Sequence, residues 1–201
     1  MNSYQIDVEE YKPESCKELY SNLNTHQITA LMFHDEMTDL FDFLGLEGFK
    51  QMHEYQYLSE SINHRALKKY YMNQYGMLLP DDQIDSIDVI PSDWYQHNRM
   101  AVTPGVRRQA VQRAMEQYKD WESYTKDLYQ KCASHLLNWG KISDFNEINC
   151  YIKDVDEELK NLESLCVELK AVGYEDTYMV SMQDCYKHKY GELLKNIGSE
   201  I

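Results

Sequence analysis

The chain has no long hydrophobic run, although 43% of its 201 residues are hydrophobic. A helix needs about 20 consecutive apolar residues to cross a bilayer, and no segment of this sequence approaches that length. The N-terminus also lacks the basic and then apolar segment that is typical of a secretory signal peptide. We therefore expect a soluble, cytoplasmic protein that does not interact with a membrane.

Cysteine occurs at five positions, and no two of them form a CxxC pair. An odd number of cysteines without that spacing argues against a disulfide framework and against a zinc knuckle. Cys132 and Cys166 fall where a helix would bury them. A free cysteine packs at such a position as a small apolar side chain.

Basic residues are also few, because 20 lysines and arginines stand against 34 aspartates and glutamates, for a net charge of -14. Binding to a phosphate backbone needs clustered cations, so we expect no direct binding of nucleic acid. An acidic surface instead favours cations or a basic protein partner.

Apolar residues recur in steps of three and four over three long segments, which predicts a helix with one buried face in each segment. The first face includes a histidine. Its members are Leu19, Leu23, His26, Ala30, Phe33, Met37, Leu40 and Leu44. The faces of the two later segments extend from Val111 to Cys132 and from Ile148 to Leu169.

These patterns predict one helical domain that covers residues 1–201. We place its five helices at about 13–44, 49–75, 104–138, 144–172 and 177–196, with a long crossover at 77–103. Thr103 offers an N-cap directly before Pro104, and proline suits the first position of a helix. Asp144, with Glu147 three residues later, offers an N-cap for the fourth helix.

Short connections between helices make antiparallel neighbours, and one long crossover between the second and third helices is the order of a ferritin-like bundle. Residues 26–76 resemble the first helix pair of a ferritin, with Gly-Phe after the turn, Glu and then His followed by Ala-Leu, and a tyrosine-rich end. They read HQITALMFHDEMTDLFDFLGLEGFKQMHEYQYLSESINHRALKKYYMNQYG. The chain is thus similar to the ferritin-like superfamily, which implies an all-α four-helix bundle with a short C-terminal helix.

The resemblance also implies a metal site inside the bundle. In the family, the first helix supplies a carboxylate, the second a Glu-x-x-His motif, and the third and fourth further carboxylates. This chain has an incomplete motif, because none of its seven histidines follows an acidic residue by three positions. His64 stands where the histidine of the second helix would be, with Glu60 four residues before it. His26 roughly matches the carboxylate position of the first helix.

Side chains four residues apart lie about 40° apart around a helix, so Glu60 and His64 could share one ion. Glu122 and Glu158 adjoin the predicted buried faces of the third and fourth helices. The expected metal ligands are therefore His26, Glu60, His64, Glu122 and Glu158. Mixed nitrogen and oxygen ligands suit iron or manganese, with zinc as the usual competitor. The same side chains also fit a structural role at the edge of the bundle.

Two functions thus remain open. In the first, a divergent ferritin-like protein binds a transition metal through a reduced site, with catalysis not established. In the second, the fold has lost its metal and serves as a non-catalytic acidic interaction or inhibitor protein that binds a basic partner. The missing Glu-x-x-His favours the second function, and the histidine on the first buried face favours the first. The resemblance further implies a homo-oligomer.

Overall fold

The fold is described from a computed structural model, and the description covers residues 6–80, 89–90, 98–99 and 102–197. The helices are α1 Cys16–Phe43, α2 Glu47–Tyr75, α3 Pro104–Asn138, α4 Ile142–Ala171 and α5 Asp176–Ile197. The predicted all-α fold is confirmed, since the described residues contain no strand. No helix in this part of the chain has the length and apolar composition that a membrane span requires.

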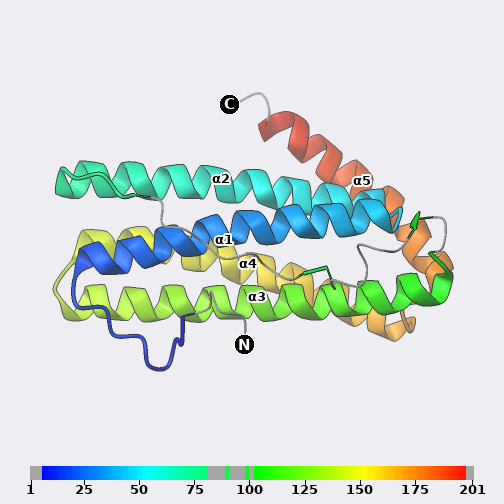
Figure 1. The fold of residues 1–201 in the computed structure, drawn as a ribbon, viewed down its shortest axis with the longest axis horizontal. Helices are drawn as coiled ribbons and strands as arrows, with labels where there is room; N and C mark the ends of the chain where they lie inside the picture. The colour runs from blue at the N-terminus through cyan, green and yellow to red at the C-terminus, as the bar shows by residue number, and fades with distance from the viewer. Residues whose placement is uncertain (1–5, 81–88, 91–97, 100–101, 198–201) are drawn as a thin grey trace.

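The four long helices form two antiparallel pairs, α1 with α2 and α3 with α4 (Figure 1). α2 ends at one end of the bundle and α3 begins at the other, so the connection between them spans the bundle (Figure 1). This is the predicted order of elements. Much of the predicted crossover lies outside the described residues. Within its described part, Val89 is buried and its backbone N–H donates to a carboxylate oxygen of Glu36 at 2.9 Å.

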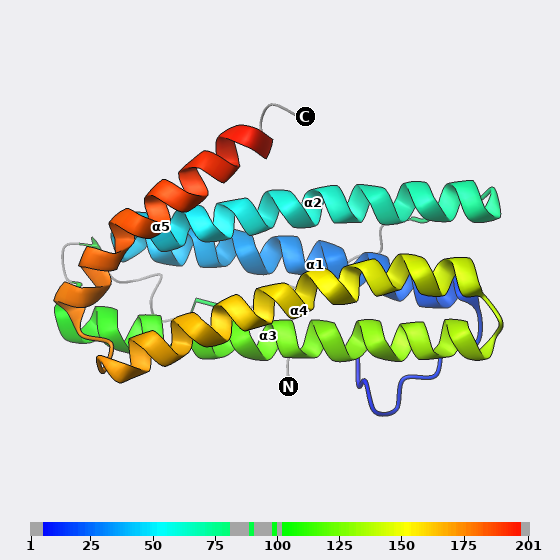
Figure 2. The same ribbon diagram turned by 180° about the vertical axis from the view of Figure 1, so that it is seen from behind.

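α5 crosses the bundle obliquely and packs against the first half of α2 (Figure 2). Gly48 allows this close approach, because a Cβ atom at that position would lie 2.6 Å from the backbone oxygen of Gln183. The side-chain oxygen of Gln183 accepts a hydrogen bond from the backbone N–H of Phe49 at 3.0 Å. The rings of Phe49 and Tyr186 meet edge to face, with centroids 5.4 Å apart.

Side-chain caps determine where two of the helices begin. α1 begins at Cys16, later than predicted, because the hydroxyl of Ser15 accepts a hydrogen bond from the backbone N–H of Glu18 at 3.2 Å. The predicted start of α3 is confirmed. Its N-cap is Thr103, whose hydroxyl accepts from the backbone N–H of Val106 at 3.3 Å.

The N-cap prediction for Asp144 is wrong, because α4 begins at Ile142 and places Asp144 within its first turn. The Asp144 side chain is buried. Its carboxylate accepts hydrogen bonds from the hydroxyls of Tyr20 and Tyr75, each at 2.9 Å. Asp144 therefore connects α4 to α1 and α2 instead of capping its own helix.

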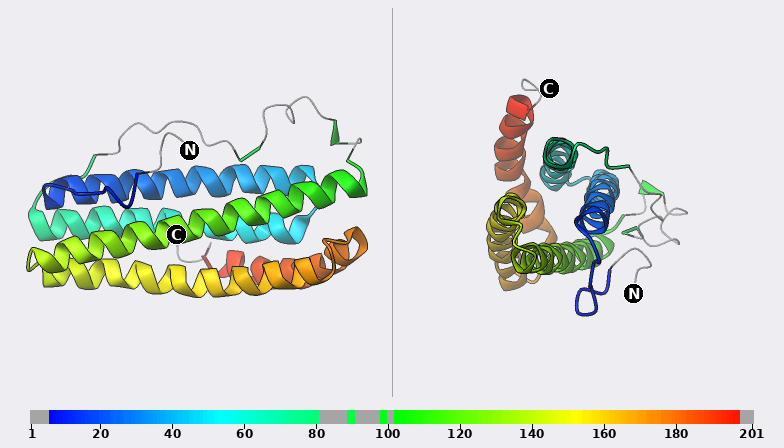
Figure 3. Two further views of the ribbon diagram at one scale, coloured as in Figure 1. Left: turned by 90° about the horizontal axis from the view of Figure 1, so that it is seen from below. Right: turned by 90° about the vertical axis from the view of Figure 1, so that its left-hand side faces the viewer.

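The apolar core consists of two clusters, one around Phe41 and Phe49 and the other around Tyr20 and Tyr71. The predicted buried face of α1 is confirmed, since none of its members is more than 5% exposed. Between the two clusters lies a set of polar side chains that we call the polar layer. Its members are His26, Gln27, His34, His53, Glu60, Glu122, Thr125 and Glu158. Figure 3 shows the four long helices arranged around this interior.

Replacing Gly48 with alanine should separate α2 from α5. The added Cβ meets backbone, which yields less readily than a side chain, so we expect the free energy of unfolding to fall by about 1–3 kcal/mol. The control is Gly105→Ala, where the nearest atom lies 3.9 Å away and alanine favours the helix. Urea unfolding of both variants measures the difference. Equal stability of Gly48→Ala and the wild type would contradict the described packing.

Candidate metal centre

Each long helix presents its part of the polar layer on an inner face with a spacing of three and four residues. This spacing keeps all members of a face on one side of the helix. On α2 the face consists of Leu46, Phe49, His53, Gln56, Glu60, Asn63 and Leu67. His53 and Glu60 thus lie on the same face of α2 as the apolar residues that pack against the rest of the bundle.

The inner faces of α3 and α4 each include one glutamate. They consist of Met115, Tyr118, Glu122, Thr125, Tyr129, Cys132 and Leu136 on α3, and of Ile148, Tyr151, Val155, Glu158, Leu162, Leu165 and Leu169 on α4. Glu122 and Glu158 therefore belong to the inner faces, although the sequence pattern placed them beside the buried faces. Glu122 is 4% exposed.

His34, Glu122 and Glu158 converge at the centre of the polar layer. One nitrogen or oxygen atom from each side chain lies within 4.8 Å of those from the other two. The Nε2 atom of His34 is 3.8 Å from Oε1 of Glu122, which is too long for a hydrogen bond. Three helices thus direct potential ligand atoms toward one point.

The pKa values of the three interior glutamates are all raised, mainly by burial. Burial, and then the charge of Glu158, raises the pKa of Glu60 to about 8. Burial raises the pKa of Glu158 to about 7, although the hydrogen bond from Tyr118 lowers it, and the charge of Asp154 adds a smaller increase. Burial, followed by the charges of Glu158 and Glu60, raises the pKa of Glu122 well above its usual range. Because the nearby charges that raise these pKa values are themselves carboxylates, a bound cation would stabilise the ionised forms of all three groups.

Two of the three buried histidines of the layer, His34 and His53, form a pair. Their Nδ1 atoms are 3.0 Å apart, so one of them must donate a proton to the other. Burial lowers the pKa of His34 to about 3 and holds that of His53 well below its usual range, so both rings are neutral at pH 7. When Nδ1 of His34 is the donor, its Nε2 carries a free lone pair on the side of Glu122.

Two donors from neighbouring helices orient Glu158. The hydroxyl of Tyr118 and the amide of Gln56 both donate to Oε1 of this carboxylate. Burial, followed by the charge of Glu158, raises the pKa of Tyr118 well above its usual range, so the phenol remains a donor. Oε1 of Glu158 is therefore held in place, while Oε2 has neither of these donors.

The donor set fits a divalent metal ion. The converging cluster contains two carboxylates and a neutral imidazole, which are the oxygen and nitrogen ligands that iron, manganese and zinc accept in proteins. Two further buried atoms, Oε2 of Glu60 and Nε2 of His53, have no hydrogen-bond partner. Buried polar atoms are rarely left without a partner. Oε2 of Glu60 is therefore available to bind a metal ion.

The structure places the five ligands predicted from the sequence in different surroundings. Glu122 and Glu158 lie in the cluster, and Glu60 is their electrostatic neighbour. His64 is partly buried on α2 and lies next to the inner face. His26 is buried elsewhere in the polar layer.

The Nε2 atom of His26 already has a partner. This atom lies 3.0 Å from the hydroxyl of Thr125, and that hydroxyl donates to the backbone oxygen of Trp121. Because the Thr125 hydroxyl donates its proton to Trp121, it accepts a hydrogen bond from His26. Nε2 of His26 is therefore the donor and has no free lone pair. The ring also stacks on Trp121, with centroids 5.0 Å apart.

Sequence reasoning missed His34 as a candidate ligand. A signal for it was present, because Gln27, Ala30, His34, Met37, Phe41 and Leu44 also follow steps of three and four. All six are buried. α1 therefore buries a face wide enough to include both His26 and His34, and the single stripe chosen from the sequence contained only His26.

His26 should make the protein sensitive to acid. Burial lowers its pKa from 6.5 to about 3 in the folded state, so the unfolded chain takes up the proton first. The stability that His26 contributes is complete above pH 6.5 and is lost as the pH falls toward 3. We expect the free energy of unfolding of the wild type to fall more steeply than that of His26→Phe, by about 1.4 kcal/mol per pH unit between pH 6 and 4.

Urea unfolding in the presence of a chelator measures this difference. His34 and His53 titrate in both proteins and cancel in the comparison, while phenylalanine retains a ring against Trp121. Parallel pH dependences for the wild type and His26→Phe would show that His26 is not held in its neutral form.

Comparisons with known proteins place the fold. No protein-family model matches the chain, and no curated protein matches its sequence. A solved structure described as a "Humanized Archaeal ferritin" has 14% sequence identity and a TM-score of 0.72, over 88% of this chain and 97% of that chain. The chain therefore has a ferritin-like fold.

Proposed function

We propose that this protein binds a transition metal ion inside its ferritin-like bundle. Glu122, Glu158 and His34 would hold the ion, and Glu60 would supply a further carboxylate. The observation that carries this proposal is the convergence of one ligand atom from each of the first three residues within 4.8 Å. We assign the chain no catalytic activity.

Iron and manganese suit this ligand set best among the biological metals. Carboxylates favour harder cations, and a single imidazole shifts the preference toward the divalent first-row metals. When bound, such an ion would supply redox chemistry at any coordination position that the protein leaves open. Zinc accepts the same ligands and is the main competitor.

The side chains around the ligands would hold them ready for the ion. Tyr118 and Gln56 orient Glu158, and His53 would accept the Nδ1 proton of His34, which would leave Nε2 of His34 available to the ion. Phe33 of α1 and Trp121 of α3, whose ring centroids are 5.1 Å apart, stack beside the ligands His34 and Glu122 that directly follow them in the chain. Binding would displace protons from the glutamates, so affinity should rise with pH.

Metal content of paired histidine variants tests the proposal. Protein purified without a chelator or an affinity metal should contain about one or two iron or manganese ions per chain, the number that interior sites of ferritin-like bundles hold. We expect His34→Gln to lose most of this metal. His64→Gln is the matched control and should retain it, because His64 lies beside the inner face.

Loss of metal in His64→Gln but not in His34→Gln would contradict the ligand set. A wild type that binds no metal after incubation with ferrous iron would overturn the metal function. The acidic interaction or inhibitor protein with a basic partner would then remain. Cytoplasmic location, homo-oligomer formation and the absence of nucleic-acid binding stay predictions under either function.

Removing the hydroxyl that orients Glu158 should weaken metal binding without unfolding the protein. Tyr118→Phe keeps the buried ring but loses the donor, and loss of such an outer contact reduces metal affinity by about 10–100-fold. Competition with a chromogenic chelator measures the Kd. Tyr124→Phe is the control, since its hydroxyl accepts from the backbone N–H of Ile6, away from the cluster. Equal Kd values for the two variants would refute an orienting role.

A further inference from the structure

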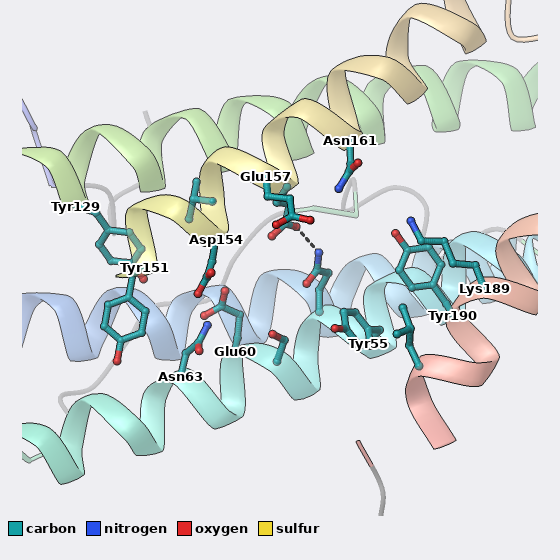
Figure 4. A pocket seen from close by; sticks show the side chains of 15 residues that line it. Tyr55, Glu60, Asn63, Tyr129, Tyr151, Asp154, Glu157, Asn161, Lys189 and Tyr190 are labelled. Atoms are coloured by element: carbon teal, nitrogen blue, oxygen red, sulfur yellow. Dashed lines mark hydrogen bonds between the residues drawn. The ribbon is translucent and has the colours of Figure 1, made fainter. Parts of the chain in front are cut away.

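A cavity of about 340 Å³ lies between α2 and α4. These two helices do not pack closely against each other, in contrast to α1 with α2 and α3 with α4. Residues from both helices, together with the second half of α5, line the cavity (Figure 4). The interior of the bundle is thus open on the side where α2 faces α4.

The cavity reaches the candidate metal centre. Glu60 from α2 and Glu158 from α4 both line it, and both belong to the interacting carboxylates of the polar layer. Anything that fills the cavity therefore contacts two of the proposed ligands directly.

The lining of the cavity attracts positive charge. Its described residues include four carboxylates, which are Glu60, Asp154, Glu157 and Glu158, and one cation, Lys189. The ammonium group of Lys189 lies over the ring of Tyr190, 4.9 Å from its centroid. The side chains of Asp154 and Glu60 extend toward one another from opposite helices (Figure 4). Carboxylates thus continue from the exposed Asp154 to the buried centre.

Glu60 supplies a second observation that points to a cation. Its Oε2 atom is buried and has no hydrogen-bond partner. An unpartnered carboxylate oxygen next to a polar cavity is costly unless water or a cation binds it. Glu60 faces Asp154 (Figure 4), and the charges of both Glu158 and Asp154 act on it, so it lies near the outer and the inner carboxylates alike.

The size of the cavity fits a hydrated ion. One water molecule takes up about 30 Å³ in the liquid, so 340 Å³ holds about ten waters. A divalent cation with about six water ligands would fit without losing its hydration shell. The ion could then exchange water for carboxylate oxygens stepwise.

We propose that this cavity is the route by which a hydrated divalent cation reaches the buried carboxylates, and that Asp154 is the first carboxylate it meets. This inference rests on the proposed metal function. Asp154 acts on the rate of uptake and is not one of the final ligands.

Stopped-flow mixing with Co²⁺, followed by quenching of tryptophan fluorescence, tests the route. Trp121 directly precedes Glu122, so its emission reports on the centre. At low ionic strength we expect Asp154→Asn to slow binding several-fold, because it removes one charge from the path. Dissociation should slow by a similar factor, so the Kd changes less than the rate. Added salt should slow the wild type more than the variant.

Asp120→Asn is the matched control. It removes the same charge from an exposed position on α3, outside the cavity lining, and should bind Co²⁺ at the wild-type rate. Equal association rates for Asp154→Asn and Asp120→Asn would overturn the route while leaving the metal function intact. Faster dissociation with unchanged association would make Asp154 a ligand and also overturn it. A wild type that binds no Co²⁺ would overturn both proposals.

Discussion

Three carboxyl groups inside a helical bundle are the constraint on which the rest of this structure depends. Glu60, Glu122 and Glu158 lie between two apolar clusters, and the charges that raise their pKa values are carboxylates. Their raised pKa values favour the protonated forms in the metal-free protein, and a bound cation would favour the ionised forms. Tyr118 and Gln56 donate to Glu158, and the neutral His34, paired with His53, lies beside Glu122.

The division of the core explains how the bundle tolerates this layer. The cluster around Phe41 and Phe49 and the cluster around Tyr20 and Tyr71 bury the large apolar side chains at the two ends. Each cluster joins several helices without needing apolar residues at the centre. The two apolar clusters at the ends of the bundle can thus supply the stability of the fold. The polar layer in the middle then contains carboxyl groups that a purely structural core would exclude.

The sequence predicted the helices and their order, because apolar residues spaced by three and four must share one buried face. It could not decide between His26 and His34. These residues are eight positions apart, about 80° around the helix, and α1 buries both. Only the packed partner separates them, since His26 meets Thr125 whereas His34 meets Glu122. The role of Asp144 was equally hidden, because its partners Tyr20 and Tyr75 come from other helices.

The most direct test of a metal centre in the polar layer is anomalous diffraction from a crystal grown or soaked with Mn²⁺. The account predicts a peak within about 2.0–2.3 Å of ligand atoms of Glu122, Glu158 and His34. A peak found only at surface carboxylates, or a structure in which these side chains hydrogen-bond one another around no metal, would contradict it.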